Sequence, residues 1–185
     1  STVGNFAGAA SGKVAQLHNM GVTDSLLEII ASPTINDEIK QETMDALSKL
    51  TKDEKLLEKM SENDKLATTI AKALFDSGKK KLNALQKGLV MATLEAAGNL
   101  ASNPEALAEF LKNGGIKAII ELMRANKDDP ELLAKCANAL DKLSFSDDAI
   151  KEIIELQGLE LISELYKKYP NLLETEIEES LSFSE

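Results

Sequence analysis

The chain has 185 residues, of which 43% are apolar and 28% are charged, and its net charge at pH 7 is −10. This composition is typical of a folded globular protein and excludes a disordered chain. The excess of negative charge disfavours a nucleic acid or an anionic membrane surface as the main partner.

The sequence contains no apolar run of the roughly 20 residues that a membrane-spanning helix requires. It opens without the basic and then apolar residues of a secretory signal, and its single cysteine excludes an internal disulfide. We therefore expect a cytoplasmic protein that does not insert into membranes. Most of the negative charge lies late in the sequence, since residues 147–185 hold 11 Asp or Glu and only 3 Lys.

Similar segments recur along the chain at a nearly constant spacing. We take the fourth residue of each "A-L-x-x-L"-like segment as a marker, which gives Asn5, Lys49, Asn99 and Lys142. Successive markers are 44, 50 and 43 residues apart. The positions 16 residues after each marker are Gly21, Lys65, Gly115 and Gly158. Because the spacing persists where the sequence drifts, it indicates a structural repeat.

The first full copy covers residues 9–51 and the second covers 52–101. The third helix of the first copy is predicted to bury one apolar face, made of Met44, Leu47 and Leu50. The second copy carries an insertion around residues 75–88, where Lys79–Lys81 form a basic loop. Three consecutive lysines on a loop either face solvent or contact a partner.

The third copy, residues 102–144, has the clearest pattern of three helices. A polar residue, Ser102 or Asn103, caps a short helix over 105–112, and a glycine pair ends that helix. The second helix is predicted to bury Ile116, Ile119, Leu122 and Met123. The third helix, about 131–144, is predicted to bury Leu133, Ala137, Leu140 and Leu143.

The last copy, residues 145–185, is short and acidic. Its second helix is predicted to bury the residues that correspond to those of the third copy, namely Leu159, Ile162, Leu165 and Tyr166. Residues 170–185 form either part of a terminal cap or a frayed tail.

Small residues recur in the third helices at Ala46, Ala96 and Ala139, and they permit the close helix approach that a stacked array needs. No alternating or β-branched run predicts a strand. The sequence therefore predicts an all-α fold.

A short helix, a glycine-marked turn, a second helix and a long third helix closing on "A-L-x-N-L-A" resemble the armadillo repeat. The resemblance is strongest at 95–145 and weak at 52–94. HEAT repeats are the nearest alternative, but they lack the short first helix and its glycine. The resemblance implies a right-handed α-solenoid of three-helix repeats.

In this frame residues 1–185 are expected to form a single domain, as a fragment of a longer array. The expected units are the end of a preceding repeat (1–8), three full repeats (9–51, 52–101 and 102–144) and a short C-terminal capping repeat (145–185).

The armadillo resemblance implies that the third helices line a groove for a protein or peptide partner, where the asparagine of the motif bonds an extended backbone. Asn5 and Asn99 match that motif, whereas Lys49 and Lys142 depart from it. The chain contains no Trp, which argues against a nuclear-signal receptor of the importin-α kind. The predicted groove set is Asn5, Glu42, Asp45, Lys49, Glu95, Asn99, Lys135, Asn138 and Lys142.

Two other classes of function are alternatives to partner binding. A self-assembling or docking domain of a larger cytoskeletal, chaperone, GTPase-regulatory or ciliary protein is the alternative within the same fold. An enzyme is disfavoured, because His18 is the only histidine, Cys136 occupies a small packing position, and no phosphate loop or metal-ligand spacing is present. We expect no catalytic residue, cofactor or metal.

Overall fold

The computed structural model describes residues 21–78 and 80–172, and Asn5 and His18 lie outside this part of the chain. Within it the regular structure is entirely helical, which confirms the all-α prediction. The α-helices are α3 (Val22–Ala31), α4 (Asp37–Thr51), α5 (Glu54–Met60), α6 (Lys65–Ser77), α7 (Ala84–Asn99), α8 (Pro104–Lys112), α9 (Gly115–Ala125), α10 (Pro130–Leu143), α11 (Asp147–Glu155) and α12 (Gly158–Lys168). A 3-10 turn, η2 (Leu100–Ser102), follows α7. None of these helices is long and apolar enough to cross a membrane.

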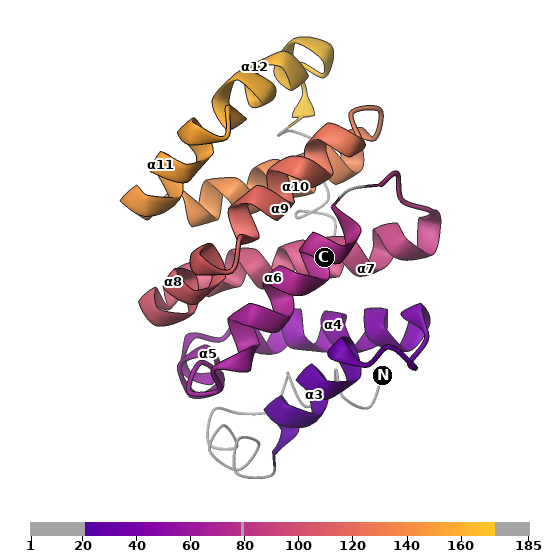
Figure 1. Cartoon of the computed structure of the whole chain (residues 1–185), viewed down its shortest axis with the longest axis vertical. Helices are drawn as coiled ribbons and strands as arrows, with labels where there is room; N and C mark the ends of the chain where they lie inside the picture. Colours follow the sequence, from indigo (N-terminus) through magenta and orange to yellow (C-terminus); the bar gives the residue numbers. More distant parts are fainter. Residues whose placement is uncertain (1–20, 79, 173–185) are drawn as a thin grey trace, which may run out of the picture.

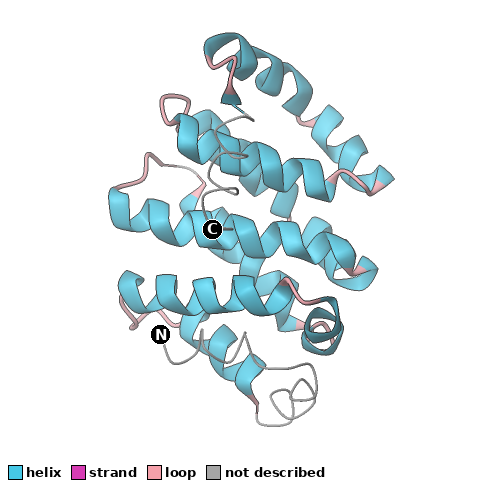
Figure 2. Ribbon diagram, turned by 180° about the vertical axis from the view of Figure 1, so that it is seen from behind, coloured by secondary structure: helices cyan, strands magenta, loops and turns pink. Residues whose placement is uncertain are grey.

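The helices stack in layers along the long axis of the molecule (Figure 1). On one side α4, α7 and α10 lie next to one another in this order (Figure 2). On the opposite side α3, α6 and α9 form a second row, and α11 and α12 close the end of the stack (Figure 1). The side chains of α4, α7 and α10 therefore share one surface although they come from distant parts of the sequence.

The helices of the second row begin at nearly regular intervals. The first residues of α3, α6, α9 and α12 are 22, 65, 115 and 158, with separations of 43, 50 and 43 residues. These separations agree within one residue with those of the sequence markers. The longest interval contains the link between α6 and α7, residues 78–83, where the sequence predicts an insertion.

Polar side chains fix where most of the helices begin. The side chain of Asn103, one of the two caps that the sequence predicts, accepts a hydrogen bond from the backbone N–H of Ala106, and Pro104 takes the first helical position. At α7, Asn83 and Gln86 satisfy each other's backbone N–H groups in a capping box. The other side-chain N-caps are Asn36, Asp53, Asp129 and Ser146.

The two glycines between α8 and α9 have different roles, one in the turn and the other in helix packing. Gly114 adopts a φ of 77°, in the left-handed region that glycine tolerates best. Gly115 has an ordinary conformation, but a Cβ atom there would lie 2.3 Å from the ring of Phe110, which is fully buried. The pair therefore reverses the chain and lets α9 pack closely on the end of α8.

One hydrophobic core runs through the layers, and Ala46, Ala96 and Ala139 are all buried in it. The predicted apolar faces of α4, α9 and α10 are buried throughout. The prediction for α12 is wrong in part: Leu165 is buried, whereas Leu159 is 55% exposed. Leu159 is exposed because the described part of the chain places no further helical layer beyond α12.

The insertion loop is attached to the neighbouring layer by one buried side chain. Asn126, which follows α9, accepts a hydrogen bond from the backbone N–H of Leu82 at 3.3 Å. Its amide donates to the carbonyl of Leu122 at 2.9 Å and to that of Lys80 at 3.4 Å. Lys80 and Lys81 themselves remain exposed.

Candidate functional site

The predicted groove set, apart from Asn5, lies on three neighbouring helices. Three members lie on α4, two on α7 and three on α10, and these helices run side by side (Figure 2). Several of them are engaged in contacts between the helices, which the sequence alone does not reveal.

Glu95 on α7 and Lys135 on α10 form an ion pair. Their carboxylate and ammonium groups are 2.6 Å apart, and the side chains are only 26% and 21% exposed. Burial raises the pKa of Glu95, but the hydrogen bond and charge of Lys135 outweigh it, and Lys142 and Lys52 act in the same direction, so that the pKa lies below its usual value. Glu95 is therefore charged and held between α7 and α10.

Asn99, which the resemblance assigns to a partner's backbone, already bonds the neighbouring helix. Its amide nitrogen donates to the carbonyl of Ser48 at 2.8 Å and to Oγ1 of Thr51 at 3.2 Å. The carbonyl of Ser48 belongs to the last turn of α4, where carbonyls lack a backbone donor within the helix, and it also accepts a hydrogen bond from Oγ1 of Thr51 at 3.2 Å. This leaves the Oδ1 atom of Asn99 as the group that can accept a hydrogen bond from a partner.

The members of the groove set on α4 interact among themselves. Desolvation raises the pKa of Asp45, and Lys49, one turn further on, opposes this shift, while Glu42 adds to it. Among the described residues, no hydrogen bond or ion pair joins these three side chains to the groove residues of α7 or α10. Asn138 is half-buried on α10.

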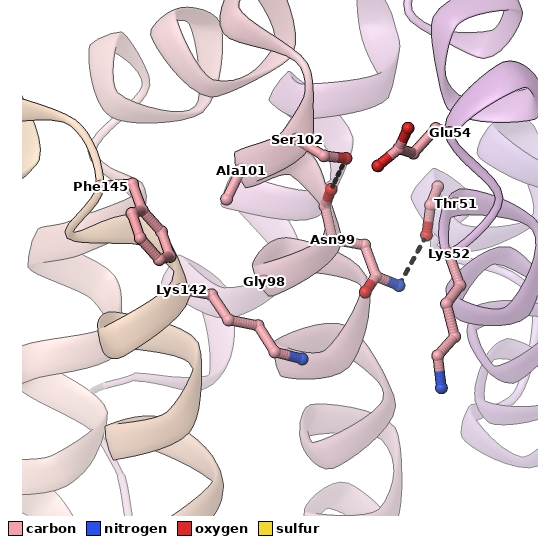
Figure 3. Close-up of a pocket in the computed structure, with 9 residues that line it drawn as sticks. All are labelled: Thr51, Lys52, Glu54, Gly98, Asn99, Ala101, Ser102, Lys142 and Phe145. Atoms are coloured by element: carbon pink, nitrogen blue, oxygen red, sulfur yellow. Dashed lines mark hydrogen bonds between the residues drawn. The ribbon is translucent and has the colours of Figure 1, made fainter.

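A hollow of about 310 Å³ opens where α4, α7 and α10 end. Figure 3 shows Phe145 and Lys142 on one side of it, Lys52 and Glu54 on the other, and Asn99 between them. The nine residues that line it, here called the hollow, are Thr51, Lys52, Glu54, Gly98, Asn99, Ala101, Ser102, Lys142 and Phe145.

Lys142, at the side of the hollow, lies across a glycine of α7 (Figure 3). A Cβ atom at Gly98 would be 3.1 Å from Cδ of Lys142, so the absence of a side chain at residue 98 lets the lysine stem lie close to α7. Neither Lys142 nor Lys52 has a carboxylate within ion-pairing distance among the described residues. Both ammonium groups are thus available to a ligand.

Phe145 was not predicted as a functional residue. It follows α10 in the segment "KLSFSD" and is 87% exposed, more than any other large hydrophobic residue of the described chain. Its position could have indicated its exposure, because Phe145 lies just beyond the point where the apolar pattern of the third helix ends. An exposed aromatic ring beside a polar hollow is a typical contact residue for a protein partner.

Cys136 is fully buried, and no group of histidine, cysteine and carboxylate side chains in residues 21–78 and 80–172 is arranged to hold a metal ion. Comparison of the chain with protein-family models, curated proteins and solved structures finds no match.

Proposed function

We propose that this chain is a right-handed, armadillo-type α-solenoid that binds a segment of a partner protein across α4, α7 and α10, without catalysing a reaction itself. The hollow carries this proposal, because it combines an exposed aromatic ring with two ammonium groups and an amide oxygen that have no partner among residues 21–78 and 80–172. Such a mixture fits a peptide, which presents apolar side chains, charged side chains and backbone N–H groups together.

The spacing of the helices also supports an array of repeats. The three helices α5, α6 and α7 are followed by a second set of three, α8, α9 and α10. The two sets are in contact, since α6 packs on α9 and α7 packs on α10. In such arrays a continuous surface arises from equivalent helices of successive units. The hollow lies on that surface, at the ends of three such helices.

A selection of random 12-residue peptides displayed on phage tests the proposal with the intact chain as bait. Peptides that bind are then measured against Phe145→Ser and Lys142→Met. We expect affinity to fall about tenfold or more, which corresponds to loss of one well-buried contact. Phe75→Ser, which removes an exposed aromatic side chain outside the hollow, is the matched control. If every selected peptide binds the hollow variants and the original chain equally, the proposal is wrong.

Self-association is a second candidate, favoured by the apolar residues at the α11–α12 end. Ile116 and Leu159 are each the second residue of their helix, α9 and α12, yet Ile116 is 0% exposed and Leu159 is 55% exposed. Likewise Leu107 in α8 is buried, whereas Ile150 at the same position of α11 is exposed. A further layer of helices would cover the positions that α11 and α12 leave open.

Sedimentation velocity of the chain and of Leu159→Lys distinguishes the two candidates. A dimer that dissociates in the variant supports association through this end. A monomer at concentrations up to about 100 μM, well above the range of specific dimers, contradicts it and leaves peptide binding as the function.

A further inference from the structure

The charges around the hollow differ in sign from those of the protein as a whole. The chain carries a net charge of −10. Of the charged residues that line the hollow, however, two are lysines and one is a glutamate. The ammonium groups of Lys52 and Lys142 have no carboxylate within ion-pairing distance among the described residues, and the lining of the hollow carries an excess of one positive charge.

The positive potential reaches further into the groove. Lys52 and Lys142 both contribute to the lowered pKa of Glu95, whose own charge is already bonded to Lys135. A ligand carboxylate placed between Lys52 and Lys142 would therefore meet two cations, of which Lys142 is half-buried and Lys52 is exposed. Charge pairs with a half-buried side chain are worth more than pairs on an open surface.

The remaining lining residues define the shape of the ligand. Phe145 and Ala101 offer apolar contact, and Oδ1 of Asn99 offers an acceptor that suits a backbone N–H group. A lone anion would gain nothing from an acceptor or an exposed ring. A nucleic acid, as a long polyanion, would be repelled by the negative charge of the rest of the chain.

We propose that the hollow selects an extended acidic protein segment in which an apolar side chain, held against Phe145, is flanked by Asp or Glu residues held by Lys52 and Lys142. This inference rests on the proposed function and specifies the chemistry of the partner.

The test uses the intact chain and three fluorescently labelled synthetic peptides, GEEEFEEEG, GQQQFQQQG and GEEEAEEEG, with binding followed by fluorescence anisotropy. We expect the first peptide to bind at least about tenfold more tightly than either of the others, and to weaken as salt is raised, because salt screens the charge pairs. Lys142→Glu and Phe145→Ser should each reduce its affinity by a similar factor.

Matched controls separate the hollow from general charge. Lys72→Glu changes the net charge by the same amount on an exposed position of α6, and Phe75→Ser removes an exposed aromatic side chain of the same helix, outside the hollow. Both should bind the first peptide as the original chain does. Because Lys142→Glu also changes the packing over Gly98, Lys52→Glu on the exposed end of α4 repeats the test of charge.

Two results would overturn the inference. If the glutamine peptide binds as tightly as the glutamate peptide and both depend on Phe145, the hollow binds peptides without selecting acidic ones, and the proposed function stands. If none of the three peptides binds at up to about 1 mM, a very weak affinity, the inference fails, and the phage selection decides the proposed function separately.

Discussion

Glu95 and Lys135 lie 2.6 Å apart and join α7 to α10 by a partly buried ion pair. The pair lies in the middle of the surface that the sequence assigns to a partner. It therefore holds two of the predicted groove residues in the structure of the chain itself, and a substitution of either residue has a consequence for stability that can be measured.

Replacing Glu95 by Gln should lower the free energy of unfolding by roughly 1–3 kcal/mol at pH 7, because Lys135 loses its anionic partner. The pKa of Glu95 is lowered in the folded chain, so the charged carboxylate stabilises the fold above its ordinary pKa of 4.5. That contribution is lost as the pH falls through the lowered pKa. Urea unfolding of both proteins at pH 7 and near pH 3 measures the difference.

The control for this prediction is Glu58→Gln, because Glu58 is exposed on α5 and has no ion pair among the described residues. Its stability should match that of the original chain at both pH values. A difference between Glu95→Gln and the original chain that stays constant down to pH 3 would contradict the role of the ion pair.

Replacing Asn99 by Ala should destabilise the chain by about 1–2 kcal/mol, because the Ser48 carbonyl loses the shorter of its two side-chain hydrogen bonds and keeps the one from Oγ1 of Thr51. Thr51→Val removes one of the two acceptors of Asn99 and also the hydrogen bonds that the Thr51 hydroxyl donates to Leu47 and Ser48. Because the two side chains bond each other and share the Ser48 carbonyl, a double-mutant cycle followed by urea unfolding should give an effect that differs from the sum of the two single effects. Strict additivity would show that Asn99 and Thr51 act independently.

How much the sequence could predict differs between the helices and the contacts of the site. The start of α8 follows from Asn103 and Pro104, because caps are local signals in the sequence. The bond from Asn99 to Ser48 could not be predicted, since the two residues are 51 positions apart and meet only through helix stacking. Leu159 was misjudged for a related reason: its apolar pattern is local, but its burial depends on what lies beyond α12.

Replacing Gly115 by Ala should cost about 1–3 kcal/mol, because the new methyl group would collide with the ring of Phe110, which is buried. The variant Phe110→Leu makes room and also loses packing. In a double-mutant cycle monitored by thermal unfolding, Gly115→Ala should lower the free energy of unfolding by less when Phe110→Leu is also present. An equal cost in both backgrounds would locate the strain elsewhere in the turn.

Asn126 is expected to control the accessibility of the basic loop between α6 and α7. Its side chain bonds the backbone of Leu82 and of Lys80. Asn126→Ala removes both bonds, so local opening of the loop should become more frequent. Trypsin cleavage after the exposed Lys80 and Lys81, timed by mass spectrometry, should accelerate by about tenfold, as expected for roughly 1.4 kcal/mol of lost local stability.

Asn113→Ala, which changes an exposed asparagine bonded within its own helix end, should leave the rate unchanged. An unchanged rate in Asn126→Ala would mean that other contacts hold the loop.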